Sequence, residues 1–344
     1  MKRAAVWELR EAVRAHPSAD PRTKHCGKTR YQRHVELQRS EDGAAGWYQG
    51  VVRCRTRTCP VCWIARRHKI AREIDHVVTA RTAQTQCAGA LATLTVRHHK
   101  GHHVRLAKDV RMCWRYLLQS RAWRTFKKQN GVECIIAEEV TLGPNGWHPH
   151  MHILLLPNRE LAVANPWDLA GAWFEQWRRI VARKLGKEHE PTREHGVDLQ
   201  KCDSGGYLSK LGLELSDPRG VKGRSPLAML AEGQLDEYMT LQNSRRRARD
   251  ITFSRGLRAL RDSLPPPTDP VVVAHLVGSD WGRLTRNGLD VALDISEKAG
   301  DASVVRARLA QELGGAAESY DPREYAENSA VLVDDLGGNE WNVT

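Results

Sequence analysis

The sequence predicts an α+β protein with a central antiparallel sheet. Two segments with strand character, 132–142 and 150–156, are joined by the turn sequence Gly143-Pro144-Asn145-Gly146 and predict a β-hairpin. Amphipathic segments at 104–130 and 168–185 flank this hairpin and predict helices. The resulting order of strand, helix, hairpin, helix, strand and helix is typical of helices packed on an antiparallel sheet.

The elements of this core follow from local patterns. The apolar run 90–96 predicts a buried strand. The segment 104–130 has helical spacing of its apolar residues and ends before Gly131, and the segment 168–185 does the same before Gly186. We therefore expect one continuous helix in each segment.

The second half of the chain contains shorter elements. The segment 197–199 predicts a short strand, and 203–215 predicts a short helix. The segment 225–261 is basic and has helical character, and the triple proline 265–267 predicts a linker. The residues that follow are acidic, and we expect them to be partly helical and partly disordered.

The charge distribution indicates a polyanionic partner. The 344 residues carry a formal net charge of +12. Residues 266–344 hold 6 Lys and Arg against 14 Asp and Glu, so the basic excess lies in residues 1–265. A basic surface attracts nucleic acid. The charged segment 1–14 is not typical of a signal peptide, and no apolar run has the length of a membrane span, so we expect a cytoplasmic protein without a membrane partner.

Three histidines alternate along the second hairpin strand. His148, His150 and His152 project to one face, because alternate side chains of a strand share a face. Neutral imidazoles are good ligands for divalent metals, and a carboxylate on the partner strand would complete the site. Glu138 and Glu139 both lie on that strand, and only the pairing register decides which of them faces the histidines. His148 is as suited to hydrogen-bonding DNA as to binding the metal.

A tyrosine in the segment 203–215 is a candidate nucleophile. In a helix, Asp203, Lys210 and Glu214 lie on the same side as Tyr207. A tyrosine phenolate can attack a metal-polarised phosphodiester and retain the 5′ phosphate covalently. Lys210 would stabilise the developing negative charge, and Asp203 or Glu214 would activate a water or a second hydroxyl. Asp203 is equally suited to capping the helix.

Four cysteines have the spacing of a structural metal site. Cys54, Cys59 and Cys62 supply three thiolates, and Cys26 is the natural fourth ligand, with His25, His34 and His68 as possible substitutes. Four thiolates close a tetrahedral zinc site. The charged N-terminus argues for a reducing compartment, in which a disulfide framework is not expected. Basic residues surround these cysteines and predict contacts with a DNA backbone.

These patterns divide the chain into four expected parts. They are a basic zinc-binding module (1–85), a catalytic core (86–215), a basic helical extension (216–264) and an acidic, partly disordered tail (265–344).

The chain resembles HUH endonucleases, named for a histidine-hydrophobic-histidine motif, and in particular the rolling-circle replication initiators (Rep) of actinobacterial plasmids or integrative elements. The resemblance covers roughly residues 26–260. The matching segments are His148-Pro149-His150-Met151-His152, Thr93-Leu94-Thr95, Tyr207-Leu208-Ser209-Lys210, Arg53-Cys54, Cys59-Pro60-Val61-Cys62 and Thr252–Arg258.

The resemblance implies a ferredoxin/RRM-like palm and metal-dependent nicking of single-stranded origin DNA through a covalent 5′-phosphotyrosyl intermediate, followed by strand transfer. It implies that His150, His152 and Glu139 bind Mg²⁺ or Mn²⁺, and it favours Glu139 over Glu138. It implies that Tyr207 is the single nucleophile and that an acidic residue four positions earlier, here Asp203, ends the reaction. The expected partners are a single-stranded or hairpin origin, a host helicase, because the chain has no Walker A motif, and a host DNA polymerase.

Two alternatives remain at the level of the sequence. An HUH transposase or conjugative relaxase would use the same chemistry on transposon ends or a transfer origin. A non-enzymatic zinc-ribbon DNA-binding regulator would need only the cysteines and the basic surface, and the intact histidine pair and Tyr207 argue against it.

Overall fold

The computed structural model describes residues 3–27, 29, 31, 35–39, 46–100, 104–159, 166–202, 223–246, 248–265 and 271–276. The chain divides into two compact units. The larger unit contains the described residues of Glu8–Asp20 and Arg55–Pro267. The smaller contains those of Lys2–Trp7, Pro21–Cys54 and Thr268–Thr344. Within the described ranges, no helix has both the length and the apolar character needed to cross a membrane.

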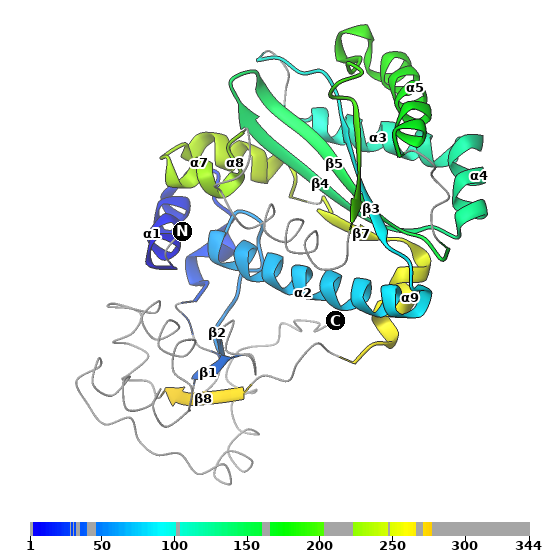
Figure 1. Cartoon of the computed structure of the whole chain (residues 1–344). Helices are drawn as coiled ribbons and strands as arrows, with labels where there is room; N and C mark the ends of the chain where they lie inside the picture. The colour runs from blue at the N-terminus through cyan, green and yellow to red at the C-terminus, as the bar shows by residue number, and fades with distance from the viewer. Residues whose placement is uncertain are drawn as a thin grey trace, which may run out of the picture. The chain divides into compact units, whose positions relative to one another are not determined.

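A five-stranded antiparallel sheet organises the larger unit (Figure 1). Its strands, in spatial order, are β6 (Val197–Cys202), β3 (Gly89–Thr95), β5 (Gly146–Leu156), β4 (Glu133–Gly143) and β7 (Ile251–Phe253). The predicted α+β architecture with an antiparallel sheet is confirmed.

The hairpin of β4 and β5 sets the register at the centre of the sheet. Gly143 pairs with Gly146, so that Pro144 and Asn145 form a two-residue turn. Gly146 has a φ of 89°, and a Cβ there would lie 3.0 Å from the Cα of Lys100. Glycine therefore meets both the backbone and the packing requirement of this turn.

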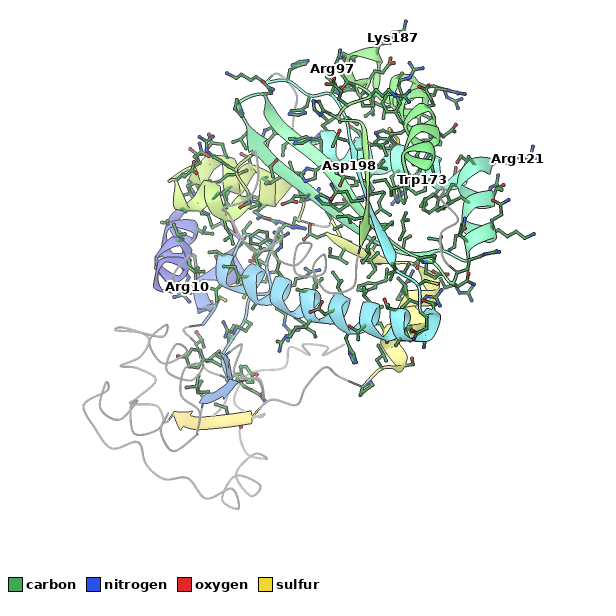
Figure 2. The ribbon with its side chains drawn as sticks, in the orientation of Figure 1. Arg10, Arg97, Arg121, Trp173, Lys187 and Asp198 are labelled. Atoms are coloured by element: carbon green, nitrogen blue, oxygen red, sulfur yellow. The ribbon has the colours of Figure 1, made fainter. Side chains whose placement is uncertain are left out.

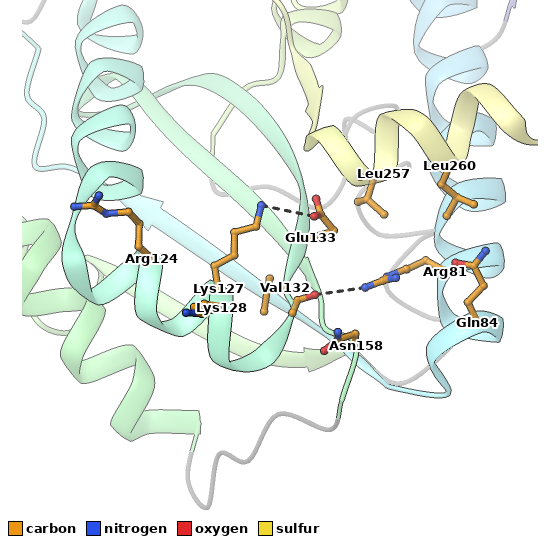
Figure 3. Close-up of a pocket in the computed structure, with 12 residues that line it drawn as sticks. Arg81, Gln84, Arg124, Lys127, Lys128, Val132, Glu133, Asn158, Leu257 and Leu260 are labelled. Atoms are coloured by element: carbon orange, nitrogen blue, oxygen red, sulfur yellow. Dashed lines mark hydrogen bonds and ion pairs between the residues drawn. The ribbon is translucent and has the colours of Figure 1, made fainter.

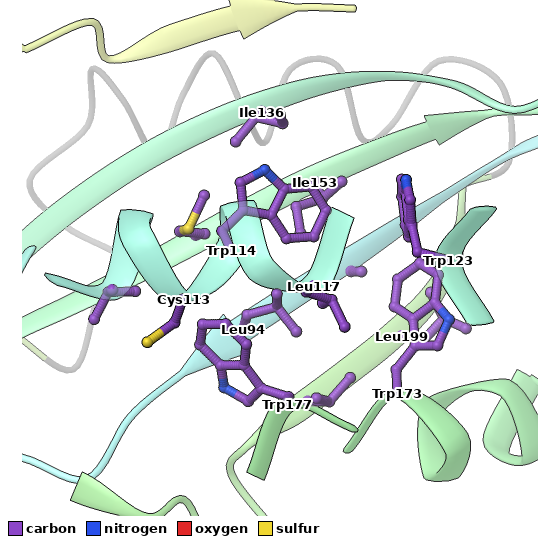
Figure 4. Packing of buried hydrophobic residues seen from close by; sticks show 14 of the residues in the cluster. Leu94, Cys113, Trp114, Leu117, Trp123, Ile136, Ile153, Trp173, Trp177 and Leu199 are labelled. Carbon is purple, nitrogen blue, oxygen red and sulfur yellow. The ribbon is translucent and has the colours of Figure 1, made fainter. Parts of the chain in front are cut away.

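One face of the sheet packs against α3 (Leu106–Gln119), α4 (Arg121–Asn130) and α5 (Pro166–Leu185). Four tryptophans fill this interface, namely Trp114, Trp123, Trp173 and Trp177 (Figure 4). The rings of Trp123 and Trp173 lie 5.1 Å apart, and Trp177 Nε1 donates a hydrogen bond of 2.7 Å to the Thr95 carbonyl. This face is an apolar core, in which the Trp177 indole nitrogen has a hydrogen-bond partner and the buried Trp114 indole nitrogen has none among the described residues.

The opposite face packs against α2 (Pro60–Thr85) and α9 (Arg255–Ser263) (Figure 1). Ile74, Val77 and Val78 of α2 meet Leu154 and other apolar residues of the sheet. The helix begins with Pro60 in its first turn, where a proline needs no amide hydrogen, and ends at Gln86 in the left-handed conformation. At 26 residues, α2 spans roughly 39 Å and follows the length of the sheet.

A third apolar cluster contains α7 (Pro226–Ala231) and α8 (Leu235–Ser244). Tyr238 is fully buried in it, and its hydroxyl donates a hydrogen bond of 3.0 Å to the Thr58 carbonyl. Val140 of β4 belongs to the same cluster. The cluster thus joins the segment before α2 to the end of β4.

The segment 104–130 forms two helices, so the prediction of one continuous helix is wrong. Ser120 is extended, with φ −66° and ψ 149°, and its side chain accepts a hydrogen bond from the backbone amide of Trp123. This cap begins α4, which ends at Gly131 in the left-handed conformation.

The segment 225–261 is not helical throughout. The three residues Ile251–Phe253 form β7, which pairs with β4 between α8 and α9. A strand this short has little pattern of its own, and its pairing with a neighbouring strand decides its structure.

The smaller unit contains a three-stranded sheet in the order β2 (Gly46–Gln49), β1 (Val35–Arg39) and β8 (Val271–Leu276). Val35, Leu37 and Tyr48 are buried. The described part of the expected acidic tail is therefore a strand paired with β1. The remaining described elements of the chain are α1 (Arg3–Ala15), η1 (Pro21–His25) and η2 (Lys187–His189).

Candidate metal centre

The β4–β5 register brings one glutamate to two histidines. Glu139 pairs with His150 and Ala137 pairs with His152, whereas Glu138 pairs with Met151. Because side chains alternate along a strand, Glu139 shares a face with the two histidines. Its Oε2 lies 3.2 Å from Nε2 of His150 and 3.7 Å from Nε2 of His152.

These three side chains have the composition of a divalent-metal site. Their ligand atoms all lie within 4.8 Å of one another. Glu139 is 6 % exposed, His150 7 % and His152 9 %. One carboxylate oxygen and two imidazole nitrogens suit Mn²⁺ and related ions, and three protein ligands leave positions open for a substrate.

The hydrogen bonds of the imidazoles orient them toward the glutamate. His150 Nδ1 lies 3.3 Å from the His148 carbonyl oxygen, which can only accept. If Nδ1 donates there, neutral His150 directs a lone pair from Nε2 at the Glu139 carboxylate, which also only accepts. Both contacts are favourable when a cation lies between His150 Nε2 and the Glu139 carboxylate. This cation is either a proton on the ring or a metal ion. The donor set therefore fits a metal ion.

His152 has a partner from a third strand. The Thr93 hydroxyl on β3 lies 3.0 Å from His152 Nδ1, and Thr93 pairs with His152 in the sheet. This contact holds the ring with Nε2 toward Glu139. Three neighbouring strands thus build the group.

The Glu139 carboxyl is held in its ionised form. Burial by itself would raise its pKa, but hydrogen bonds from His150 and His152 and the positive charge of Arg67 lower the pKa below the ordinary value. Arg67 comes from α2, and its guanidinium lies 4.3 Å from the centre of the Trp63 ring. An ionised carboxylate is the form that binds a metal.

Glu138 belongs to a separate ionic network. It pairs with Arg111 of α3 and lies 3.4 Å from Arg245. Arg245 also contacts Asp250, which accepts two hydrogen bonds, of 2.7 and 2.8 Å, from Nη1 of Arg57. These partners account for Glu138 without a metal.

His148 lies beside the group and outside it. Its ring stacks on His98 at 4.4 Å, and the centres of the His148 and His150 rings are 4.9 Å apart. Burial, followed by the neighbouring histidines, lowers the pKa of His148 to about 3. A neutral His148 can accept or donate a hydrogen bond at the rim of the site.

The four N-terminal cysteines are divided between the two units. Cys26 and Cys54 are buried in the smaller unit, and Cys59 and Cys62 are buried at the start of α2 in the larger unit. Four thiolates would close a tetrahedral zinc site, in which Zn–S bonds are about 2.3 Å long. The other cysteines with described side chains, Cys87, Cys113 and Cys134, are free and buried elsewhere.

Three of the predicted catalytic residues, Asp203, Tyr207 and Lys210, lie in 203–222, outside the described residues. The sequence analysis did not predict two neighbours of the Glu139, His150 and His152 group, namely Arg67 and Thr93. Thr93 belongs to a segment recognised by resemblance, but its bond to His152 depends on the pairing of β3 with β5. Arg67 reaches the site through the packing of α2, for which the sequence has no local signal.

Comparison with known proteins finds three similar curated proteins, each named "Protein rep". The protein from Streptomyces lividans is 28% identical over 232 residues, which cover 54% of this chain and 50% of that protein. Those from Bacillus amyloliquefaciens and a Bacillus species are each 26% identical, over 235 and 214 residues, and cover 67% and 61% of this chain. The chain spans 61% of each of these two.

No family model matches the chain, and no solved structure matches it. The chain is thus similar to Rep proteins over between half and about three fifths of their length.

Proposed function

We propose that this protein is a replication initiator that nicks single-stranded DNA at an origin and remains covalently attached to it. The observation that carries the proposal is the group of Glu139, His150 and His152, which lies on adjacent strands of the sheet. The similarity to proteins named "Protein rep" supports the role in replication.

The group of three side chains would hold Mg²⁺ or Mn²⁺ through Glu139 Oε2 and the Nε2 atoms of both histidines. A bound ion would polarise the scissile phosphate and reduce its negative charge. Thr93 and the His148 carbonyl keep the imidazoles directed at one point. Hydrogen bonds from His150 and His152 lower the pKa of Glu139, and the positive charge of Arg67 on α2 adds to this effect.

Tyr207 supplies the nucleophile in this proposal. Its phenol loses a proton, its oxygen forms a bond to phosphorus, and the bond from phosphorus to the 3′ oxygen breaks. The departing 3′ oxygen takes up a proton and becomes a free hydroxyl that primes a polymerase. Lys210, three residues later, stabilises the negative charge of the phenolate and the phosphate.

A second transfer releases the protein. Asp203 takes a proton from a water or from a second 3′ hydroxyl, whose oxygen then displaces the Tyr207 phenolate from phosphorus. A hydroxyl as acceptor rejoins a DNA strand, and a water ends the reaction. A helicase and a polymerase of the host would extend the nicked strand.

The cysteine group has a supporting role. Zinc held by Cys26, Cys54, Cys59 and Cys62 would stabilise the segment before α2, which contributes basic residues that can contact a DNA backbone. We expect about one zinc per purified chain by elemental analysis. A Cys59→Ser/Cys62→Ser variant that kept its zinc would contradict the assignment.

The test incubates the whole chain with Mn²⁺ and single-stranded oligonucleotides that tile the DNA on both sides of its own gene. We expect a protein–DNA adduct on a denaturing gel with the parent and with Tyr116→Phe, a control at a partly exposed tyrosine of α3. Tyr207→Phe should form none. An adduct with Tyr207→Phe at the parental level would overturn the nucleophile, and one formed by His150→Ala/His152→Ala would overturn the metal site.

A further inference from the structure

A second site lies at the other end of the sheet. A cavity of about 580 Å³ opens between α2, α4, α9 and the ends of β4 and β5 (Figure 3). Its volume is typical of a small-molecule or nucleotide site.

The cavity is distinct from the metal centre. Glu133 and Glu139 are six residues apart on β4, which corresponds to roughly 20 Å along a strand. Arg67 and Arg81 are fourteen residues apart on α2, which corresponds to roughly 21 Å along a helix. No side chain of the group of Glu139, His150 and His152 lines the cavity.

Four basic side chains line the cavity against one acidic side chain. Lys127 Nζ lies 3.7 Å from Glu133 Oε1, so these two charges partly neutralise each other. Arg124 and Lys128 are exposed, and neither has a carboxylate within 4.0 Å among the described residues. The cavity therefore carries an excess of positive charge that an anion can neutralise.

Arg81 adds a donor that the described residues do not satisfy. Its Nη2 donates a hydrogen bond of 3.4 Å to the Gly131 carbonyl, which fixes the guanidinium at the wall of the cavity (Figure 3). Its Nε is buried and has no hydrogen-bond partner among the described residues. Arg81 therefore contributes a positive charge that is fixed at the cavity wall.

The rest of the wall suits the remainder of a nucleotide. Leu260 of α9 is partly buried and presents apolar surface across from the basic residues, and Gln84 and Asn158 present amides. Asn158 is held in place by its backbone amide, which donates 3.1 Å to the Asn130 carbonyl. Phosphate, apolar and amide contacts in one cavity are the combination that a nucleotide needs.

We propose that this cavity binds the phosphate group of a nucleotide, which is either free or part of a nucleic-acid strand. Where a strand supplies it, the inference rests on the proposed function, and the cavity would hold the backbone roughly 20 Å from the nicking site.

The test measures binding of the whole, zinc-loaded chain in buffer without Mg²⁺ or Mn²⁺, so that no cleavage occurs. The probes are a fluorescent 20-residue oligothymidylate and, separately, AMP. The variant Arg124→Gln/Lys128→Gln removes two exposed charges from the cavity, and Arg183→Gln/Lys187→Gln removes two exposed charges elsewhere. Lys187 lies at the outer edge of the larger unit, beyond α5 (Figure 2).

We expect the cavity variant to bind the oligonucleotide roughly tenfold more weakly at low salt and to lower the salt slope by about one, while the control stays near the parent. AMP binding lost with the cavity variant would identify a free nucleotide as the ligand. If the cavity variant binds the oligonucleotide more weakly and the parent does not bind AMP, the ligand is a nucleic-acid strand. Equal effects of the two variants, or none, would overturn the proposal. The nicking reaction is not measured, so a failure of the proposed nuclease leaves this result interpretable.

Discussion

Strand β5 presents Met151, Ile153 and Leu155 to one side of the sheet and His150 and His152 to the other. The first side is an apolar core with four tryptophans. The second combines apolar packing against α2 with a buried carboxylate and two imidazoles. One strand therefore serves stability through one set of alternate residues and chemistry through the other, so substitutions on the two sides should have separable effects.

The largest effect is expected on the chemical side. The variant His150→Ala/His152→Ala should lower adduct formation about a hundredfold or more, because it removes two of three metal ligands. Its urea unfolding should remain cooperative, because the tryptophan side is unchanged. Mn²⁺ titration and adduct gels measure the first effect. A variant that binds Mn²⁺ as the parent does would show that β5 does not separate the two roles as described.

A large effect of the other kind is expected on the apolar side. Ile153 is fully buried, and Ile153→Ala should lower the free energy of unfolding by about 2–5 kcal/mol, whereas Ile153→Val should lower it by about 0.5–1.5 kcal/mol. Urea unfolding measures both changes. At urea concentrations below the unfolding transition, the Mn²⁺ affinity of Ile153→Val should equal that of the parent. A Mn²⁺ affinity that falls together with the free energy of unfolding would show that the two sides of the sheet do not have separate roles.

An intermediate effect is expected at the hydrogen bond between Thr93 of β3 and His152. Thr93→Val removes the hydroxyl that orients His152 and should weaken Mn²⁺ binding by about 10–100-fold. Thr93→Ser keeps a hydroxyl and should restore most of the affinity. If the serine variant bound as weakly as the valine variant, packing at Thr93 rather than its hydrogen bond would explain the loss.

The smallest effect is expected from thiol reactivity in the apolar core with the four tryptophans. Burial raises the pKa of Cys113 to about 12 and that of Cys134 to about 11. At pH 8 both thiols are therefore protonated, and only the thiolate reacts with an alkylating reagent. Iodoacetamide should modify both cysteines only after urea unfolding, as mass spectrometry can show. Rapid modification in the folded protein would mean that water enters the tryptophan side.

Local patterns predicted the hairpin, its turn and the two flanking helical segments. They did not predict the break at Ser120, because the apolar spacing before it gave no sign that its side chain would cap a new helix. They also missed β7, a three-residue strand that exists through its pairing with β4.

The candidate site shows the same division between local and long-range information. The alternation of His150 and His152 follows from the strand pattern alone. The position of Glu139 beside them follows from a register that the Gly143–Gly146 turn sets. Thr93 and Arg67 come from other elements, and only packing over long sequence separations brings them to the site. The assignment of Tyr207 remains a prediction.

We propose that metal held by Glu139, His150 and His152 serves a transesterification by Tyr207. To identify the attached residue, the whole chain is incubated with single-stranded DNA in buffer with or without Mn²⁺, and the adduct is mapped by mass spectrometry of its peptides. We expect a 5′-phosphate linkage at Tyr207 in Mn²⁺, and none without an added divalent ion or with His150→Ala/His152→Ala. A linkage at another residue, or an equal yield without an added divalent ion, would overturn this mechanism.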